Sequence, residues 1–267
     1  MRKIIEIWKE TFIILRRYPQ IFLPFLLVGI FSGITLYILY LAPQRPVSFL
    51  LAPPIRVFFG EKFLHYPYNL YLLPKLYYYA HILIGATLGI LMNATACFML
   101  KDIYYREREP RILANSFLSL KRYFSLLGIW AIIFFLSYFW LRLIKIKGEN
   151  SISFSIFSFL GNVFISTLFI YAIPALVFEK RKIFSALGRS LVLFKKFPFL
   201  TLFLVFIPSS FYLPVIFLKR NILFLMEHFS PEIIIFVLGI GISVSVVVDL
   251  FTTTLPAVLF LKEGGKR

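Results

Sequence analysis

Six long runs of apolar residues dominate this sequence of 267 residues. The runs cover residues 19–42, 76–100, 123–141, 151–178, 197–218 and 233–261. Only the last contains a charged residue, Asp249. An α-helix rises 1.5 Å per residue, so about 20 apolar residues cross a hydrocarbon core of about 30 Å. The sequence therefore predicts an all-α, polytopic membrane protein with six transmembrane helices. The first run follows a mixed-charge stretch and lacks a small-residue cleavage site, so we expect a span and not a cleaved signal peptide.

Composition excludes the soluble alternatives. The chain is 60% hydrophobic and 15% charged, whereas soluble domains average about 45–50% apolar and about 25% charged residues. The net charge of +17 is typical of nucleic-acid binding proteins, but a water-soluble chain with this much apolar surface would have no core to bury it in. We therefore expect no nucleic acid among the partners. The single cysteine, Cys97, allows no intramolecular disulfide.

The basic residues also predict an orientation. If the six runs are spans, 20 of the 29 Lys and Arg residues fall on the side of both termini and nine fall on the other side. Basic residues accumulate on the cytoplasmic side of membrane proteins. The sequence thus predicts a multi-pass protein of the cytoplasmic (inner) membrane with cytoplasmic N- and C-termini.

A repeated pattern precedes the first, third and fifth runs. It reads WKETFIILRRYP at residues 8–19, LANSFLSLKRYF at residues 113–124 and LGRSLVLFKKFP at residues 187–198. Each copy contains a hydroxyl residue, apolar residues, a basic pair and an aromatic residue. The ends of the fourth and sixth runs also match, as PALVF at residues 174–178 and PAVLF at residues 256–260. We interpret the chain as one integral membrane domain of three tandem units, at about 1–100, 101–178 and 179–262, each an amphipathic interfacial helix followed by a transmembrane hairpin.

The three basic pairs are the first candidate site. They are Arg16 and Arg17, Lys121 and Arg122, and Lys195 and Lys196. A pair at the elbow between a flat helix and a span lies at the depth of the lipid headgroups, where each basic residue gains about 1 kcal/mol from anionic lipid. The pairs are thus candidates for a lipid-headgroup site at the cytoplasmic face. Two other interpretations are a simple topology signal and a docking site for an acidic protein.

One segment resembles a known family. Residues 174–198, PALVFEKRKIFSALGRSLVLFKKFP, resemble a pattern of bacterial and archaeal six-span membrane proteins. These proteins are related to the membrane domain that is fused to some glycerophosphoryl diester phosphodiesterases. No phosphodiesterase domain follows the sixth run here. The resemblance therefore implies an architecture and a connection with lipids, not an activity.

The sequence contains no catalytic or cofactor motif. There is no HExxH, no GxxxxGK[ST] and no GxSxG, and no Cys/His cluster has the spacing of a metal site. The three histidines, His65, His81 and His228, fall near the predicted outer boundary, where we expect interfacial side chains without a ligand. We expect no metal, no cofactor and no enzymatic activity.

The second candidate site is a polar cluster inside the membrane. Asp249 lies 13 residues before Lys262, which is about 20 Å along a helix. An ionised carboxylate at this depth costs a few kcal/mol unless it is paired or hydrated. Thr253 follows one turn later, and the second and fourth runs supply Asn93 and Asn162. We expect one of two roles for these four residues. They form a proton- or cation-coupled site or a polar lipid pathway, or else a neutral Asp249 makes hydrogen bonds that only hold the helices together.

The connection at residues 43–75 is long and is rich in proline and aromatic residues. We expect irregular chain with short interfacial helices, serving either as a functional cap or as a passive aromatic belt. Taken together, the sequence favours a non-enzymatic scaffold or lipid-interacting membrane protein, with partner membrane subunits or a homo-oligomer as further possibilities. The alternative is a secondary transporter or permease subunit with a polar pathway around Asp249. An intramembrane enzyme is disfavoured because the spans contain one acid and no metal cluster.

Overall fold

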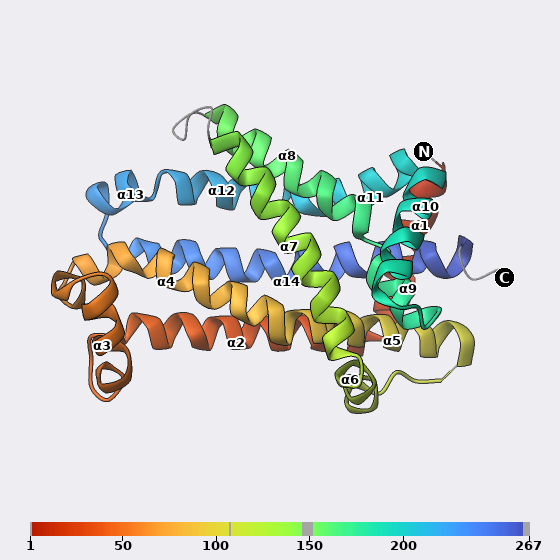
Figure 1. Cartoon of the computed structure of the whole chain (residues 1–267), viewed down its shortest axis with the longest axis horizontal. Coiled ribbons are helices and arrows are strands. Elements are labelled where there is room, and N and C mark those ends of the chain that lie inside the picture. The colour runs from red at the N-terminus through yellow and green to blue at the C-terminus, as the bar shows by residue number, and fades with distance from the viewer. Residues whose placement is uncertain (1, 107, 146–151, 264–267) are drawn as a thin grey trace. The chain divides into compact units, whose positions relative to one another are not determined.

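The computed structural model describes residues 2–106, 108–145 and 152–263, and the regular secondary structure in this part of the chain is helical (Figure 1). Lys147, Lys266 and Arg267, which enter the count of basic residues, lie outside the described residues. The helices are α1 (Arg2–Arg17), η1 (Pro19–Phe22), α2 (Leu23–Tyr40), α3 (Ser48–Phe58), η2 (Glu61–Leu64), α4 (Tyr68–Ile84), the π-helical turn η3 (Gly85–Gly89), α5 (Ile90–Arg106), α6 (Ile112–Leu120), α7 (Tyr123–Lys145), α8 (Ile152–Phe169), α9 (Ala172–Phe178), α10 (Ile183–Lys196), α11 (Pro198–Ser210), α12 (Tyr212–Arg220), α13 (Ile222–His228) and α14 (Ile233–Glu263).

The described helices include five that are long and apolar enough to cross a membrane: Pro19–Tyr40, Tyr68–Tyr105, Tyr123–Ile144, Phe154–Phe178 and Ile233–Glu263. The pair α10 and α11 makes a sixth if it is counted as one broken span, because its helices bend by 102° at a short break. The prediction of a helical multi-pass membrane protein is thereby confirmed. The second of the five begins at Tyr68, eight residues before the predicted start, because the helix continues through Pro74.

The chain divides into two compact units. Unit 1 contains residues 1–26, 86–211 and 247–267, and unit 2 contains residues 27–85 and 212–246. Within the described residues, every predicted site residue belongs to unit 1. Unit 1 thus carries α1, α5 to α11 and the second half of α14.

The core of unit 1 is built from the ends of three helical spans. Its fully buried residues gather in the last turns of α5, in α9 and in the last turns of α14. Tyr171 and Phe178 flank Phe260 with ring centroids 6.4 and 5.5 Å away. Small residues in these segments, such as Ala175 and Ala257, are completely buried and let the helices approach closely. The repeated PALVF and PAVLF segments are therefore core-forming parts of unit 1.

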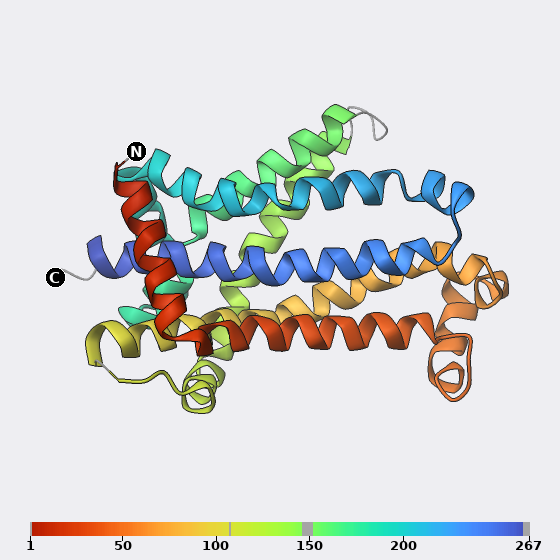
Figure 2. The same cartoon turned by 180° about the vertical axis from the view of Figure 1, so that it is seen from behind.

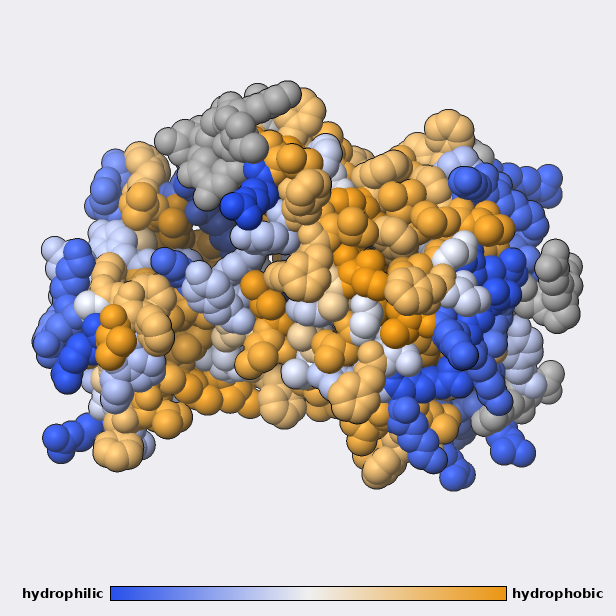
Figure 3. All heavy atoms as spheres, viewed as in Figure 1, coloured by the Kyte–Doolittle hydropathy of each residue, from blue (hydrophilic) through white to orange (hydrophobic). Residues whose placement is uncertain are grey.

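The outside of α7 is apolar. Phe135 is 65% exposed and Phe139 is 60% exposed. Figure 3 shows hydrophobic residues covering α7, whereas hydrophilic residues gather where α5 and α10 end. A patch of this kind in water would be an aggregation site, and lipid contact removes that penalty. The surface of unit 1 is thus typical of a protein that lies in a bilayer.

Unit 2 has two apolar clusters. The larger joins α2, α4, α13 and the first half of α14 through residues such as Leu36, Leu73, Met226 and Leu238. The smaller packs the connection that contains α3 and η2 onto α4 through Ile55 and Leu72. This connection is ordered into short helices, as the sequence predicts, and it occupies less chain than residues 43–75 because α4 begins early.

The α7–α8 hairpin depends on one glycine. A Cβ atom at Gly161 of α8 would lie 1.6 Å from Nε1 of Trp140, an indole of α7 whose N–H donates a 3.4 Å hydrogen bond to the Phe157 carbonyl. At Gly161 the indole of α7 therefore lies directly against the backbone of α8, in the space that a larger side chain would occupy. Gly188 of α10, by contrast, would place a Cβ atom in open space.

We predict opposite effects of the same substitution at these two glycines. Ala is favoured over Gly inside a helix by about 0.8–1 kcal/mol, so Gly188→Ala should raise the free energy of unfolding by about this amount. Gly161→Ala should lower it by about 1–3 kcal/mol, because the Trp140 indole must leave its site. Unfolding of both variants in one detergent, followed by Trp fluorescence, measures the difference. If Gly161→Ala is as stable as Gly188→Ala, the described packing of α7 on α8 is incorrect.

Candidate functional site

The basic pairs of α1 and α10 occupy the last turn of their helices and are exposed. Arg17 stacks over the ring of the next residue, Tyr18, at 5.5 Å. Lys196 covers Phe197, also the next residue, at 5.0 Å. These contacts are cation–π interactions worth about 0.5–1 kcal/mol at an exposed site. They leave the charged groups at the surface beside an aromatic ring.

The remaining pair lies between α6 and α7 and differs from the other two. Lys121 is exposed, but Arg122 is half-buried and its guanidinium donates a hydrogen bond to the Leu176 carbonyl of α9. That carbonyl is near the end of α9, where helical carbonyls have no partner in their own helix. Arg122 therefore holds unit 1 together, and Lys121 alone presents a charge to the surroundings.

The elbow after α10 is sharp. The chain turns by 102° between α10 and α11 at Phe197, and Pro198 is the first residue of α11. Proline suits this position because its missing N–H would be unpaired there in any case. The Leu187 and Leu193 side chains of α10 are buried, whereas Lys195 and Lys196 are exposed. This is the arrangement of an amphipathic helix that runs across the direction of the apolar helix that follows it.

The helix α1 packs across the last part of α14, as Figure 2 shows from behind. Trp8 and Phe251 have ring centroids 5.3 Å apart. The Lys262 ammonium forms an ion pair with Glu6 at 3.1 Å and another with Glu10. The beginning of the described chain is thereby fixed to its end.

Related contacts hold α6 and α10. The hydroxyls of Ser119 in α6 and Thr95 in α5 are both buried and 3.1 Å apart. The buried Ser190 of α10 donates to the Leu168 carbonyl at 2.8 Å and accepts the N–H of Tyr171 at 3.1 Å. Thus α6 packs on α5, and α10 packs on α8 and α9.

Charged or amide groups accompany these hydroxyls. The Asn115 amide donates to the Asp102 carboxylate at 2.9 Å. The Arg189 guanidinium pairs with Glu179 at 3.1 Å. In the three copies of the sequence repeat, Glu10, Asn115 and Arg189 occupy the same position. Each of them binds a polar residue near the end of a helical span.

The predicted intramembrane cluster is only partly assembled. Thr253 of α14 donates a long, 3.4 Å hydrogen bond to the side-chain oxygen of Asn93 in α5. Asp249 is half-buried one turn away from Thr253, and within the described residues its carboxylate has neither a hydrogen bond nor an ion pair. The Asn162 side-chain oxygen is buried in unit 1 without a hydrogen bond to another described residue. The structure brings Asn93 and Thr253 together and joins neither Asp249 nor Asn162 to them.

Metal-binding groups do not gather in the described ranges. Among residues 2–106, 108–145 and 152–263, no three His, Cys, Asp or Glu side chains lie close enough to hold a metal ion. Comparisons of the chain with models of protein families, with curated proteins and with solved structures found no match. The resemblance of residues 174–198 to the six-span family stays a prediction.

We predict that Asp249→Asn stabilises the protein. The carboxylate lies in a membrane-spanning helix and lacks a partner within the described residues, so replacing it by a neutral amide should raise the free energy of unfolding by about 1 kcal/mol or more. Thr253→Val should cost only about 0.6 kcal/mol, the average for a hydrogen bond between membrane helices. Thermal unfolding in detergent checks both values. A clear loss of stability in Asp249→Asn would mean that the carboxylate holds a partner, such as a cation, in the membrane.

Proposed function

We propose that the chain is a non-enzymatic, multi-pass protein of the inner membrane that binds anionic lipids at its cytoplasmic face, as a scaffold or as a subunit of a larger membrane complex. The observation that carries this proposal is the elbow between α10 and α11. There an amphipathic helix with a buried apolar side and two exposed lysines turns by 102° into an apolar helix. This is the geometry of a helix that lies in the headgroup layer and then enters the hydrocarbon.

The lipid headgroup is the ligand that fits this position best. At an elbow, the charged groups lie at the depth of the phosphates, and each basic residue gains about 1 kcal/mol from an anionic leaflet. Aromatic rings beside the charges, Tyr18 and Phe197, are typical of the membrane interface. Arg16, Arg17, Lys121, Lys195 and Lys196 are available for this contact, whereas Arg122 is engaged by the Leu176 carbonyl.

The proposal includes the three-unit organisation of the chain. Three contacts at one repeat position support it, from Glu10 to Lys262, from Asn115 to Asp102 and from Arg189 to Glu179. In each case an amphipathic helix is fixed to the end of a helical span. The first of these contacts, between α1 and α14, joins the beginning of the described chain to its end and supports termini on one side of the membrane. The excess of basic residues on that side favours the cytoplasm.

We predict that Lys195→Gln/Lys196→Gln weakens the binding of phosphatidylglycerol. Loss of about 2 kcal/mol for two charges corresponds to roughly 30-fold weaker binding. The measurement is a titration of the purified protein in neutral-lipid nanodiscs with increasing fractions of phosphatidylglycerol, with the bound lipid counted by native mass spectrometry.

The matched control is Lys62→Gln/Lys75→Gln, which removes two lysines of the predicted outer side. It should leave phosphatidylglycerol binding within about twofold, because these lysines belong to no basic pair of the sequence repeat. If both double variants lose phosphatidylglycerol binding equally, the effect depends on the net charge of the protein and not on the basic pairs. If Lys195→Gln/Lys196→Gln binds phosphatidylglycerol as well as the unchanged protein, the basic pairs are only topology signals and the proposed function is wrong.

A permease subunit is the second candidate, and one observation favours it. Asp249 lies inside a membrane-spanning helix and has no side-chain partner within the described residues. An ionisable group at such a depth commonly marks a proton or ion pathway. In that function Asp249 would exchange the ion, and the Asn93 and Thr253 side chains would line the path.

A further inference from the structure

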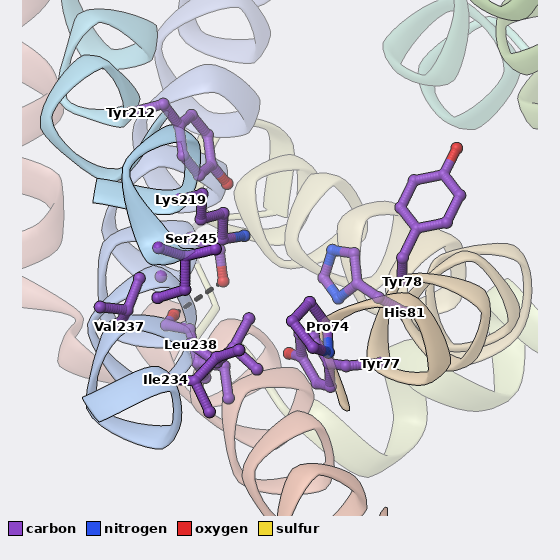
Figure 4. A pocket seen from close by; sticks show the side chains of 13 residues that line it. Pro74, Tyr77, Tyr78, His81, Tyr212, Lys219, Ile234, Val237, Leu238 and Ser245 are labelled. Carbon is purple, nitrogen blue, oxygen red and sulfur yellow. Dashed lines mark hydrogen bonds between the residues drawn. The ribbon is translucent and has the colours of Figure 1, made fainter. Parts of the chain in front are cut away.

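A cavity of about 250 Å³ lies within unit 2, between α4, α12 and the first half of α14 (Figure 4). Its wall combines apolar and polar side chains. Pro74, Ile234, Val237 and Leu238 supply apolar surface. The polar groups come from Tyr77, Tyr78, His81, Tyr212, Lys219 and Ser245.

Two basic side chains approach each other across this cavity. Figure 4 shows Lys219 extending from α12 toward His81 of α4, with Tyr212 and Ser245 on the side of Lys219. Within the described residues Lys219 has no ion pair and no hydrogen bond. His81 has a ring contact with Tyr77 at 5.7 Å and lies close enough to Lys219 for the two basic groups to repel each other. An ammonium group in an apolar wall therefore lacks a counter-charge.

A third polar group faces the cavity. Tyr77 is 6% exposed, and its buried hydroxyl lies near the Ser32 hydroxyl but makes no hydrogen bond of normal geometry to a described residue. In Figure 4 this hydroxyl turns toward the α14 side of the cavity. Buried hydroxyls in native proteins nearly always have a well-formed hydrogen bond, so a hydroxyl that faces a cavity without one is available to a ligand.

The lining determines the chemistry of that ligand. No Asp or Glu is among the described lining residues, and the two ionisable basic groups are Lys219 and His81. These groups and the Tyr77 hydroxyl are donors, so they fit a carboxylate or a phosphate. The apolar wall fits a hydrocarbon body that continues from such a headgroup.

The size and place of the cavity restrict the ligand further. Sites for drug-sized molecules measure about 300–1,000 Å³, so about 250 Å³ holds a headgroup and the first part of one chain but not two acyl chains. The cavity is lined by α4 and α14, which belong to membrane-spanning helices. A molecule dissolved in the bilayer therefore has access that a small hydrophilic anion lacks.

We propose that this cavity binds a single-chain amphipathic anion, a fatty acid or a lysophospholipid with an ionised phosphate, with its headgroup between Lys219, His81 and Tyr77. The chain of the ligand lies along Ile234 and Leu238. This site is separate in sequence from the basic pairs of the proposed function and does not depend on them.

The sequence supplies one glycine that the site requires. A Cβ atom at Gly241 of α14 would lie 3.6 Å from the Lys219 ammonium nitrogen and 3.4 Å from Cγ1 of Val215. Lys219 thus lies directly over Gly241, and any larger side chain would compete with it for space. Gly239, two residues earlier, faces open space and does not line the cavity.

The test uses the full chain in nanodiscs of neutral phosphatidylcholine and a photoactivatable oleate with a diazirine in its chain. After illumination, mass spectrometry locates the labelled peptides. We expect label on peptides of α4, α12 and α14, and about tenfold less of it in Lys219→Met, because a charged hydrogen bond is lost. The control Lys75→Met changes a lysine of α4 outside the lining and should keep the label.

Further variants keep the proposal testable if Lys219→Met is poorly folded. Gly241→Leu should remove the label and Gly239→Leu should retain it. Competition with unlabelled oleate and with oleoyl lysophosphatidate identifies the preferred headgroup, and displacement by either supports the site. Equal displacement by neutral monoolein would overturn it, as would full labelling in both Lys219→Met and Gly241→Leu. Lys195→Gln/Lys196→Gln should label normally, so failure of the lipid-binding elbows and failure of this site are distinguishable.

Discussion

The hydrocarbon interior of a membrane offers no hydrogen-bond partner to a polar group, and this constraint governs the chain at two levels. Backbone groups must pair within helices. Many hydroxyl side chains pair locally as well and donate to the carbonyl one turn earlier, as Thr95 does to Leu91 at 2.8 Å, Thr167 to Val163 at 2.6 Å and Thr254 to Leu250 at 2.7 Å. Charged and amide side chains in a span lack this local solution, so they need a partner from another helix or a ligand.

The spans could be predicted because their length and lack of charge are properties of single segments. The run at residues 233–261 became α14, Ile233–Glu263, with almost the same bounds. The breaks could not be predicted in this way. The run at residues 197–218 is interrupted between α11 and α12 at Phe211, and the 102° turn before α11 depends on how α10 packs on α8 and α9. Hydropathy indicates that a segment is apolar but contains no information on the direction in which its helix runs.

The candidate site was predictable as a set of residues but not in its chemistry. The sequence repeat makes the three basic pairs equivalent, yet Arg122 bonds to the Leu176 carbonyl, 54 positions later, and Arg17 and Lys196 do not make such a bond. Similarly, Asn93 and Asn162 each lie inside an apolar run, but only Asn93 accepts a hydrogen bond from Thr253. Long-range packing decides whether a polar side chain stabilises the fold or is free for a ligand.

The same reasoning explains why Lys219 and His81 were missed. In the sequence, Lys219 is one of nine basic residues on the less basic side, and His81 is one of three histidines near a boundary. Neither belongs to a motif, because α4 and α12 are more than 100 residues apart in the chain. The one local signal was the pair Gly239 and Gly241, which is typical of close helix packing. In the structure Gly241 makes room for the Lys219 side chain, so a glycine in an apolar helix can indicate a neighbouring charge as well as a neighbouring helix.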